Sequence, residues 1–301
     1  MDRVDRAWGR NAAIAMRLIA IPATFLTGAL VSRWLLAHAP ARWSVDLAQP
    51  LVVATNWGNF GLLLWLALAA TLAVACIPYV RTLAGPAPSR GAVLWTCALA
   101  LAAAFAWAPL FSSDVYAYAA YGEMARLGMN PYVHLIHPST DPIVAAAQWQ
   151  WGGIFPMCVY GSGFVTLAAA ITSATHLFGT LVPLAVLRTL SCLALLACAL
   201  LLSLWSTRAA WFLALNPLVI WVAAEGHNDT LAVAAVVAGF AIARKRHALG
   251  AAIVASAALI KLTALGASMA LAGHAVVGRV RAIPVLAGTV AGVAIALAGS
   301  L

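Results

Sequence analysis

Charge is what this sequence has least of. Only 8 of its 301 residues are Asp or Glu, and charged residues make up 8% of the chain, against roughly 25% in an average soluble domain. Hydrophobic residues make up 64%, and the mean hydropathy is +0.97. This scarcity of charge excludes an ordinary soluble protein. Several apolar runs reach the roughly 20 residues that a helix needs to cross a bilayer, so we predict an all-α, polytopic transmembrane helical bundle.

Metal-type cysteine spacing is also missing. The five cysteines are Cys76, Cys97, Cys158, Cys192 and Cys198. They lie in or beside apolar runs, where buried free thiols are expected and no disulfide framework is implied. The net charge of +9 would suggest nucleic acid in a soluble chain. Here the basic residues mostly flank apolar runs, where they fix orientation, so we predict no nucleic-acid partner.

Nine apolar runs are candidate spans. They cover residues 12–36, 57–79, 92–111, 160–179, 183–204, 209–225, 229–243, 248–271 and 282–301. We expect residues 1–301 to form a single transmembrane domain, entered from a cytoplasmic N-terminal tail. Residues 112–158 form the one long polar interruption. Unstructured loops of that length are uncommon unless they are functional or disordered, and the Tyr, Trp and Pro content argues against disorder.

Basic residues set the predicted orientation. They cluster before the first run, between the second and third runs, and at "ARKRH", residues 243–247. Placing these clusters inside puts residues 112–158 outside. The chain between 158 and 243 must then cross an odd number of times, whereas the candidate list gives an even number. A broken or re-entrant segment at "WFLALNPLVIW", residues 211–221, resolves this, because Pro217 disfavours helical geometry at Asn216.

The stretch "FSSDVYAYAAYGEMARLGMNPY", residues 111–132, carries unusual chemistry for this chain. We predict a helix over 114–127, capped by Ser112 or Ser113. Asp114 falls where the third run leaves the bilayer, and an ionisable residue there is a functional candidate. The structural alternative is a carboxylate that only complements the helix dipole. Glu123 and Arg126 are predicted to form a surface salt bridge.

A second polar island, "NPLVIWVAAEGHNDT", spans residues 216–230. It could be a simple turn in which Asp229 caps the next helix, but His227, Asn228 and Asp229 are more polar groups than a turn needs. Glu, His and Asp are legitimate metal ligands, but no second cluster has ligand spacing, so we predict no metal.

Lys261 lies in "ASAALIKLTALG", residues 255–266, and is one of two lysines. It follows the last polar segment by roughly 16 Å of helix, which places it at mid-bilayer. A buried cation needs an acidic side chain or a bound anion, although a snorkelling lysine is the alternative. Together with the two polar segments, it suits group transfer from an anionic lipid.

Four motifs carry a family resemblance. They are "SSDVYAYAAYGEMARLGMNPYVH" (112–134), "VYGSGF" (159–164), "LNPLVI…EGHND" (215–229) and "IKL" (260–262). Taken in this order, they resemble the polyprenol-phosphate-mannose-dependent α-(1→6)-mannopyranosyltransferases. These are multispanning glycosyltransferases of the GT-C fold class. The resemblance covers about residues 112–262.

The resemblance implies a GT-C-like bundle with a helical external catalytic loop, 112–158, after the third span. It implies an inverting glycosyltransferase that moves a sugar from a polyprenyl-phosphate donor to a hydroxyl of a lipid-linked or cell-envelope glycan. Mannose is the sugar that the resemblance favours. Asp114 matches the expected catalytic base. The implied substrate-binding residues are Tyr116, Tyr118, Arg126, Asn130, Tyr132, Tyr160, His227, Asn228, Asp229 and Lys261. No cofactor and no metal are implied.

The same resemblance implies an integral, multi-pass protein of a bacterial inner (plasma) membrane with its active site on the outer face. Its partners would be the polyprenyl-phosphate sugar donor, a glycan or glycolipid acceptor, and membrane lipids. Two departures stand out. The family usually has "YGP" where this chain has Tyr160-Gly161-Ser162. The chain also has fewer spans and stops inside the apolar run "AIALAGSL", as in a shortened relative or an incomplete sequence.

Alternatives remain open at the level of sequence. A related enzyme could use glucose, arabinose or aminoarabinose on the same lipid carrier, since nothing in the residues distinguishes these sugars. A transporter should show matching broken segments in two halves, and only the Asn216–Pro217 break is visible. A membrane protein without catalysis is the third alternative. The acceptor, the linkage and the oligomeric state are not fixed by the sequence.

Overall fold

The structure is a computed structural model that describes residues 3–38, 58–109, 111–134, 141–150, 156–277 and 282–298. Every regular element in these ranges is helical. The predicted all-helical fold is therefore confirmed. Such a fold suits a membrane, because a helix pairs its backbone N–H and C=O groups within its own segment.

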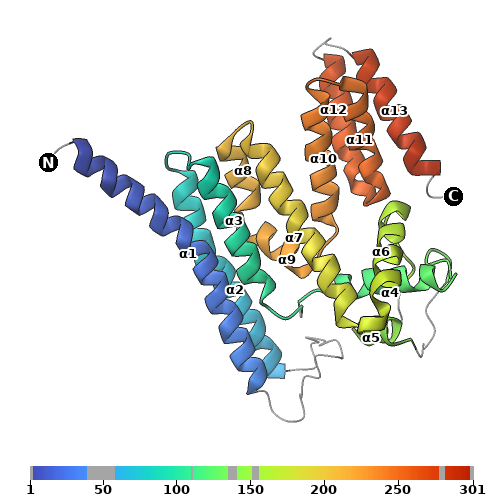
Figure 1. Ribbon diagram of the computed structural model, residues 1–301, viewed down its shortest axis with the longest axis horizontal. Helices are drawn as coiled ribbons and strands as arrows, with labels where there is room; N and C mark the ends of the chain where they lie inside the picture. Colours follow the sequence, from blue (N-terminus) through green and yellow to red (C-terminus); the bar gives the residue numbers. More distant parts are fainter. Residues whose placement is uncertain are drawn as a thin grey trace. The chain divides into compact units, whose positions relative to one another are not determined.

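The described chain divides into two compact units. The first consists of residues 1–111 and 202–225 and contains α1 (Arg3–Ala37), α2 (Gly58–Leu83), α3 (Arg90–Phe105), α8 (Thr207–Ala214) and α9 (Pro217–Glu225). The second consists of residues 112–201 and 226–301 (Figure 1). Its helices are α4 (Asp114–Arg126), α5 (Pro142–Gln150), α6 (Ser162–Thr175), η3 (His176–Phe178), α7 (Leu181–Ser203), α10 (Asp229–Ala243), α11 (His247–Ser256), η4 (Ala257–Leu259), η5 (Leu262–Ala264), α12 (Leu265–Val277) and α13 (Ala282–Ala298). The single-domain expectation stays a prediction.

Three helices in the described chain are long and apolar enough to cross a membrane. They are Ile14–Ala37 in α1, Gly61–Leu83 in α2, and α7. These correspond to the predicted spans 12–36, 57–79 and 183–204. Helices α8 and α9 pass the same test as a pair, despite a bend of 58° between them. The other predicted spans correspond to shorter apolar helices and stay predictions.

The bend between α8 and α9 has a local cause. Helix α8 ends at Ala214, and the Asn216 Oδ1 atom accepts a hydrogen bond of 3.0 Å from the N–H of Leu218. Pro217 is the first residue of α9, a position where its missing N–H leaves no unpaired donor. The predicted break at Asn216–Pro217 is therefore confirmed, whereas its re-entrant path stays a prediction.

Two predicted spans have different bounds. The third run, predicted over 92–111, forms a helix only to Phe105. The side chain of Trp107, beyond this end, packs inside the first unit. Its indole N–H donates to the carbonyl of Phe25 at 3.0 Å, and its ring packs edge-on against Trp221. The run predicted as one helix over 248–271 is interrupted between η4 and η5.

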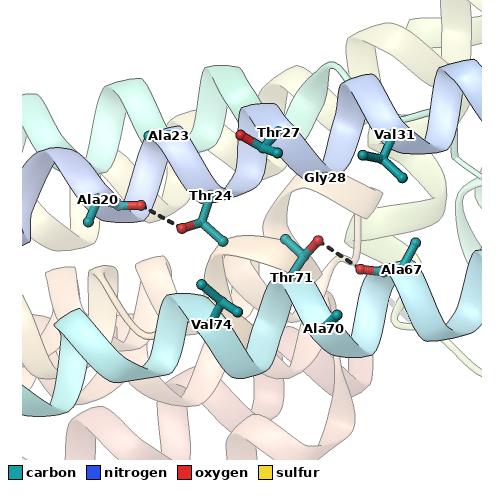
Figure 2. Close-up of a pocket in the computed structure, with 10 residues that line it drawn as sticks. All are labelled: Ala20, Ala23, Thr24, Thr27, Gly28, Val31, Ala67, Ala70, Thr71 and Val74. Atoms are coloured by element: carbon teal, nitrogen blue, oxygen red, sulfur yellow. Dashed lines mark hydrogen bonds between the residues drawn. The ribbon is translucent and has the colours of Figure 1, made fainter.

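An open groove runs between α1 and α2 in the first unit (Figure 2). Its volume is about 490 Å³, and only Ala, Thr, Gly and Val side chains line it. The hydroxyls of Thr24 and Thr71 donate to the carbonyls of Ala20 and Ala67, at 2.7 and 2.8 Å. Because these hydroxyls are turned back onto their own helices, the groove is apolar.

Gly28 lies in this groove and lets α2 and the side chain of Trp107 approach α1 closely. A Cβ atom at this position would collide with the Thr71 hydroxyl and would lie 2.5 Å from Cζ2 of buried Trp107. We expect Gly28→Ala to lower the free energy of unfolding by about 1–3 kcal/mol, the usual cost of overpacking. Thermal unfolding in detergent measures this. Gly91→Ala is the matched control, because a Cβ at Gly91 meets nothing within 4 Å. Equal stability of the two variants would contradict the packing argument.

Candidate active site

Helix α4 presents Asp114 at its first position. The helix runs from Asp114 to Arg126, in agreement with the predicted 114–127. The Ser112 hydroxyl, rather than that of Ser113, accepts the N–H of Asp114 at 3.2 Å. The helix is buried from Val115 to Met124 and packs against α5 and α6 (Figure 1). It is therefore an internal helix of the second unit.

Asp114 is the centre of a polar network. Its Oδ2 atom lies 3.1 Å from Nδ1 of His227 and accepts a hydrogen bond of 3.3 Å from the Tyr118 hydroxyl. Tyr118 also lies 3.3 Å from Oδ1 of Asn228. Asp114 and Tyr118 are one helical turn apart, so both point to one face of α4. The structure thus brings the first predicted motif together with the second.

The surroundings of Asp114 favour its ionised form. Burial raises the pKa of this carboxyl, but hydrogen bonds from His227 and Tyr118 and the nearby charge of Lys261 more than offset burial, and its pKa lies below the usual value. Both donors use Oδ2. Among the described residues, none donates to Oδ1, and the side chain keeps 27% of its surface exposed. One oxygen of an ionised carboxylate is therefore open to a substrate.

A tight turn places His227 and Asn228. Gly226 has a φ of +89°, a left-handed conformation that L side chains rarely adopt. Helix α7 supports the turn, because the hydroxyl of Ser191 donates to the carbonyl of His227 at 2.8 Å. Thr230 donates to the same carbonyl at 2.9 Å and also contacts Ser191. The carbonyl of His227 is thus held by two hydroxyls.

Sequence reasoning missed three residues of this support, namely Arg188, Ser191 and Thr230. Arg188 is buried on α7, and its Cγ atom would lie 2.9 Å from a Cβ placed on Gly226. A basic residue inside an apolar run was the available signal, the same signal that singled out Lys261. The two hydroxyl residues gave no signal, because Ser and Thr are common in transmembrane helices.

Lys261 is not in the middle of a helix, and that prediction was wrong. The backbone of Lys261 is extended, with φ −149° and ψ 125°, between η4 and η5. The carbonyl of the preceding Ile260 accepts the N–H of Gly161 at 3.1 Å, so this contact joins "VYGSGF" to "IKL". The Lys261 ammonium lies 2.7 Å from each carboxylate oxygen of Asp229. The predicted need for an acidic partner is therefore met within the chain.

Aromatic residues form a wall beside Asp114. The ring of Tyr160 packs edge-on against Tyr118 with centroids 4.9 Å apart, and burial raises the pKa of Tyr160 to about 12. The Tyr132 hydroxyl donates to the carbonyl of Tyr160 at 3.0 Å. Asn130 accepts the N–H of Tyr132 through its side chain at 2.9 Å. The hydroxyls of Tyr132 and Tyr160 are protonated near neutral pH and can serve as neutral hydrogen-bonding groups.

One predicted site residue, Arg126, lies apart from this cluster. Arg126 is at the other end of α4, about 18 Å along the helix from Asp114, and its guanidinium binds both carboxylate oxygens of Glu123. Glu123 is buried and Arg126 is partly exposed, so the predicted ion pair exists with only its arginine at the surface. Tyr116 is buried in the hydrophobic core of the second unit.

Among the side chains that the structure describes, no group of three or more His, Cys, Asp or Glu residues is arranged to hold a metal ion.

The hydropathy and the helices define the class of this protein, an integral membrane protein built from helices. The family follows from a direct comparison. Residues 9–278 match the MptA_B family model, described as alpha-(1->6)-mannopyranosyltransferase, N-terminal domain. The chain therefore belongs to this family of mannosyltransferases, and the resemblance noted over 112–262 is confirmed over a longer range. No curated protein and no solved structure matches the chain.

The turn at Gly226 can be tested by adding one methyl group. In Gly226→Ala the new Cβ would lie 2.9 Å from Cγ of Arg188 and 3.0 Å from Cγ2 of Val115. We expect the turn to shift and glycosyltransferase activity to fall by about tenfold or more, as positional errors near a site do. Gly179→Ala is the matched control. Gly179 also has a φ of +89°, but a Cβ there meets nothing within 4 Å. An equal loss of activity in Gly179→Ala would show that backbone strain alone matters. Wild-type activity in Gly226→Ala would contradict the predicted shift of the turn.

Proposed function

We propose that this protein transfers a mannosyl group from a polyprenyl-phosphate donor to a hydroxyl of a lipid-linked or cell-envelope glycan. Membership of the family supports mannosyl transfer. The resemblance of the four quoted motifs to polyprenol-phosphate-mannose-dependent enzymes supports the donor class. The observation that carries the proposal is the Asp114 carboxylate, with Oδ2 held by two donors and Oδ1 open.

In the proposed reaction the acceptor hydroxyl attacks the anomeric carbon of the donor. The proton of that hydroxyl passes to Oδ1 of Asp114, which acts as the general base. A new C–O bond forms as the bond between the anomeric carbon and the phosphate oxygen breaks on the opposite face. Polyprenyl phosphate leaves with the bonding electrons, and a single displacement inverts the anomeric configuration.

His227 and Tyr118 are proposed to position the base. Both act on Oδ2, which fixes the rotamer of Asp114 and leaves Oδ1 directed at the acceptor. They also stabilise the ionised form through hydrogen bonds to it. Asn228 holds Tyr118 in turn, since it lies 3.3 Å from that hydroxyl. A base held in one orientation gains much of the rate that proximity can supply.

The two sides of the cleaved bond are assigned to different parts of the site. Tyr160, Tyr132 and Asn130 are proposed to face the sugar, where neutral hydrogen-bonding groups suit a carbohydrate. Lys261 is proposed to face the donor phosphate, because a cation stabilises the charge that develops on the leaving group. Arg126, which is bound to Glu123, is not part of this proposal.

Replacing Asp114 tests its proposed role as the base. We expect Asp114→Asn to lower mannosyl transfer at least about 100-fold, the usual minimum contribution of a general base, because the amide cannot accept the proton. Transfer is measured with membranes and radiolabelled polyprenyl-phosphate mannose, followed by identification of the labelled lipid or glycan.

Asp141→Asn is the matched control for this experiment. Asp141 precedes α5, and its Oδ1 atom accepts the N–H groups of Ile143 and Val144 at 2.9 and 3.0 Å, an arrangement that Asn preserves. This variant should keep wild-type transfer. Full activity of Asp114→Asn would remove Asp114 from the role of base. No labelled product from the wild-type chain would remove the proposed donor.

We also propose that the site opens to the outer face of a bacterial inner membrane, from the positions of the basic residues. Val133 is 65% exposed next to the site, and Lys245 is exposed in the turn after α10. In a variant without the native cysteines, Val133→Cys should react with a membrane-impermeant maleimide in cells whose inner membrane is intact. Lys245→Cys should react only after that membrane is opened. Reaction of both from one side would contradict this orientation. Ser139, another position suited to such labelling, lies outside the described residues.

A further inference from the structure

The ion pair of Lys261 and Asp229 holds the cation that the proposed function assigns to the donor phosphate. The ammonium lies 2.7 Å from both carboxylate oxygens, a close, charge-assisted arrangement. The pair is not sealed in the core, because the side chains of Lys261 and Asp229 are 26% and 43% exposed. A ligand can therefore reach both partners.

The backbones on which the two side chains stand are fixed. The Lys261 N–H donates to the carbonyl of Ala257 at 3.2 Å, and its carbonyl accepts the N–H of Ala264 at 3.0 Å. Asp229 is the first residue of α10, whose positive dipole end favours a carboxylate. Any rearrangement of the pair is therefore a movement of side chains.

The charges near the site favour such a rearrangement. Asp114 and Asp229 both carry carboxylates, and the Lys261 charge acts on Asp114 as well as on Asp229. While Asp229 holds the ammonium through both oxygens, a phosphate would meet a neutral pair beside the negative Asp114. Like charges so placed repel one another. The phosphate therefore competes with Asp229 for the positive charge of the Lys261 ammonium.

We propose that Asp229 is a competing internal ligand of Lys261, and that the Asp229 carboxylate and the phosphate of a polyprenyl phosphate exchange on its ammonium. This inference rests on the proposed function. It assigns Asp229 a role opposite to that of a phosphate ligand, because its carboxylate weakens binding of the lipid phosphate.

The exchange can proceed stepwise. An ammonium group has three N–H donors, so a phosphate oxygen can take the third while Asp229 keeps the other two. Asp229 can then turn toward solvent, where the N-terminal end of α10 still stabilises its charge. Transfer of the sugar leaves polyprenyl phosphate on Lys261. The return of Asp229 to Lys261 then displaces the product lipid.

The test is direct binding of polyprenyl monophosphate to the purified full chain in lipid nanodiscs, measured by isothermal titration calorimetry. The neutral variants Asp229→Asn and Asp229→Ser should bind this lipid roughly tenfold more tightly than wild type, which corresponds to the loss of one charge-assisted interaction. Asp229→Glu keeps the carboxylate and is the matched control, with affinity near that of wild type.

The tighter lipid binding expected of the two neutral Asp229 variants must depend on Lys261. Lys261→Met should bind the lipid at least tenfold more weakly than wild type, by the same reasoning, and adding Asp229→Asn to it should restore nothing. Unchanged or weaker binding by both neutral variants would overturn the inference, as would a gain that persists without Lys261. These outcomes leave the proposed function standing if the wild-type chain binds the lipid and transfers mannose. No binding by any of these chains would overturn both.

Discussion

In the hydrocarbon region of a membrane, every backbone N–H and C=O group must find its partner within the protein. That constraint makes the described chain helical almost throughout, and it leaves the ends of helices as the places where polar side chains can gather. Asp114 begins α4, Asp229 begins α10, and Lys261 lies in the short extended gap between η4 and η5. The candidate site residues are concentrated where the backbone ladder is interrupted.

The sequence predicted those features that depend on local signals. Hydropathy located α1, α2 and α7, serine capping and a first-turn acid predicted α4, and Pro217 predicted the bend that follows Asn216. Scarcity of charge was the most informative signal for the site. With so few ionisable residues in the chain, those that fall beside apolar runs stand out. In the structure Asp114 contacts His227 directly and is linked to Asn228 through Tyr118.

Other features depend on contacts between distant segments and could not be predicted locally. The break before Lys261 has no proline or glycine to mark it, and it coincides with the hydrogen bond from Gly161 to the carbonyl of Ile260. Glu123 is buried because α6 packs over α4. Its i,i+3 spacing with Arg126 predicted the pairing correctly, but pair spacing says nothing about which face of a helix is covered.

The distance along the chain between the two halves of the network has a consequence for biosynthesis. Tyr118 and Asn228 are 110 residues apart, and ribosomes add about 5–20 residues per second. Helix α4 is therefore made several seconds before the turn that orients Asp114. During that interval Tyr118, on the same helix, is already present, but His227 is not. The contacts of Asp114 with His227 and of Tyr118 with Asn228 can form only after the turn at Gly226 has been made, so an unfinished chain lacks the complete candidate site.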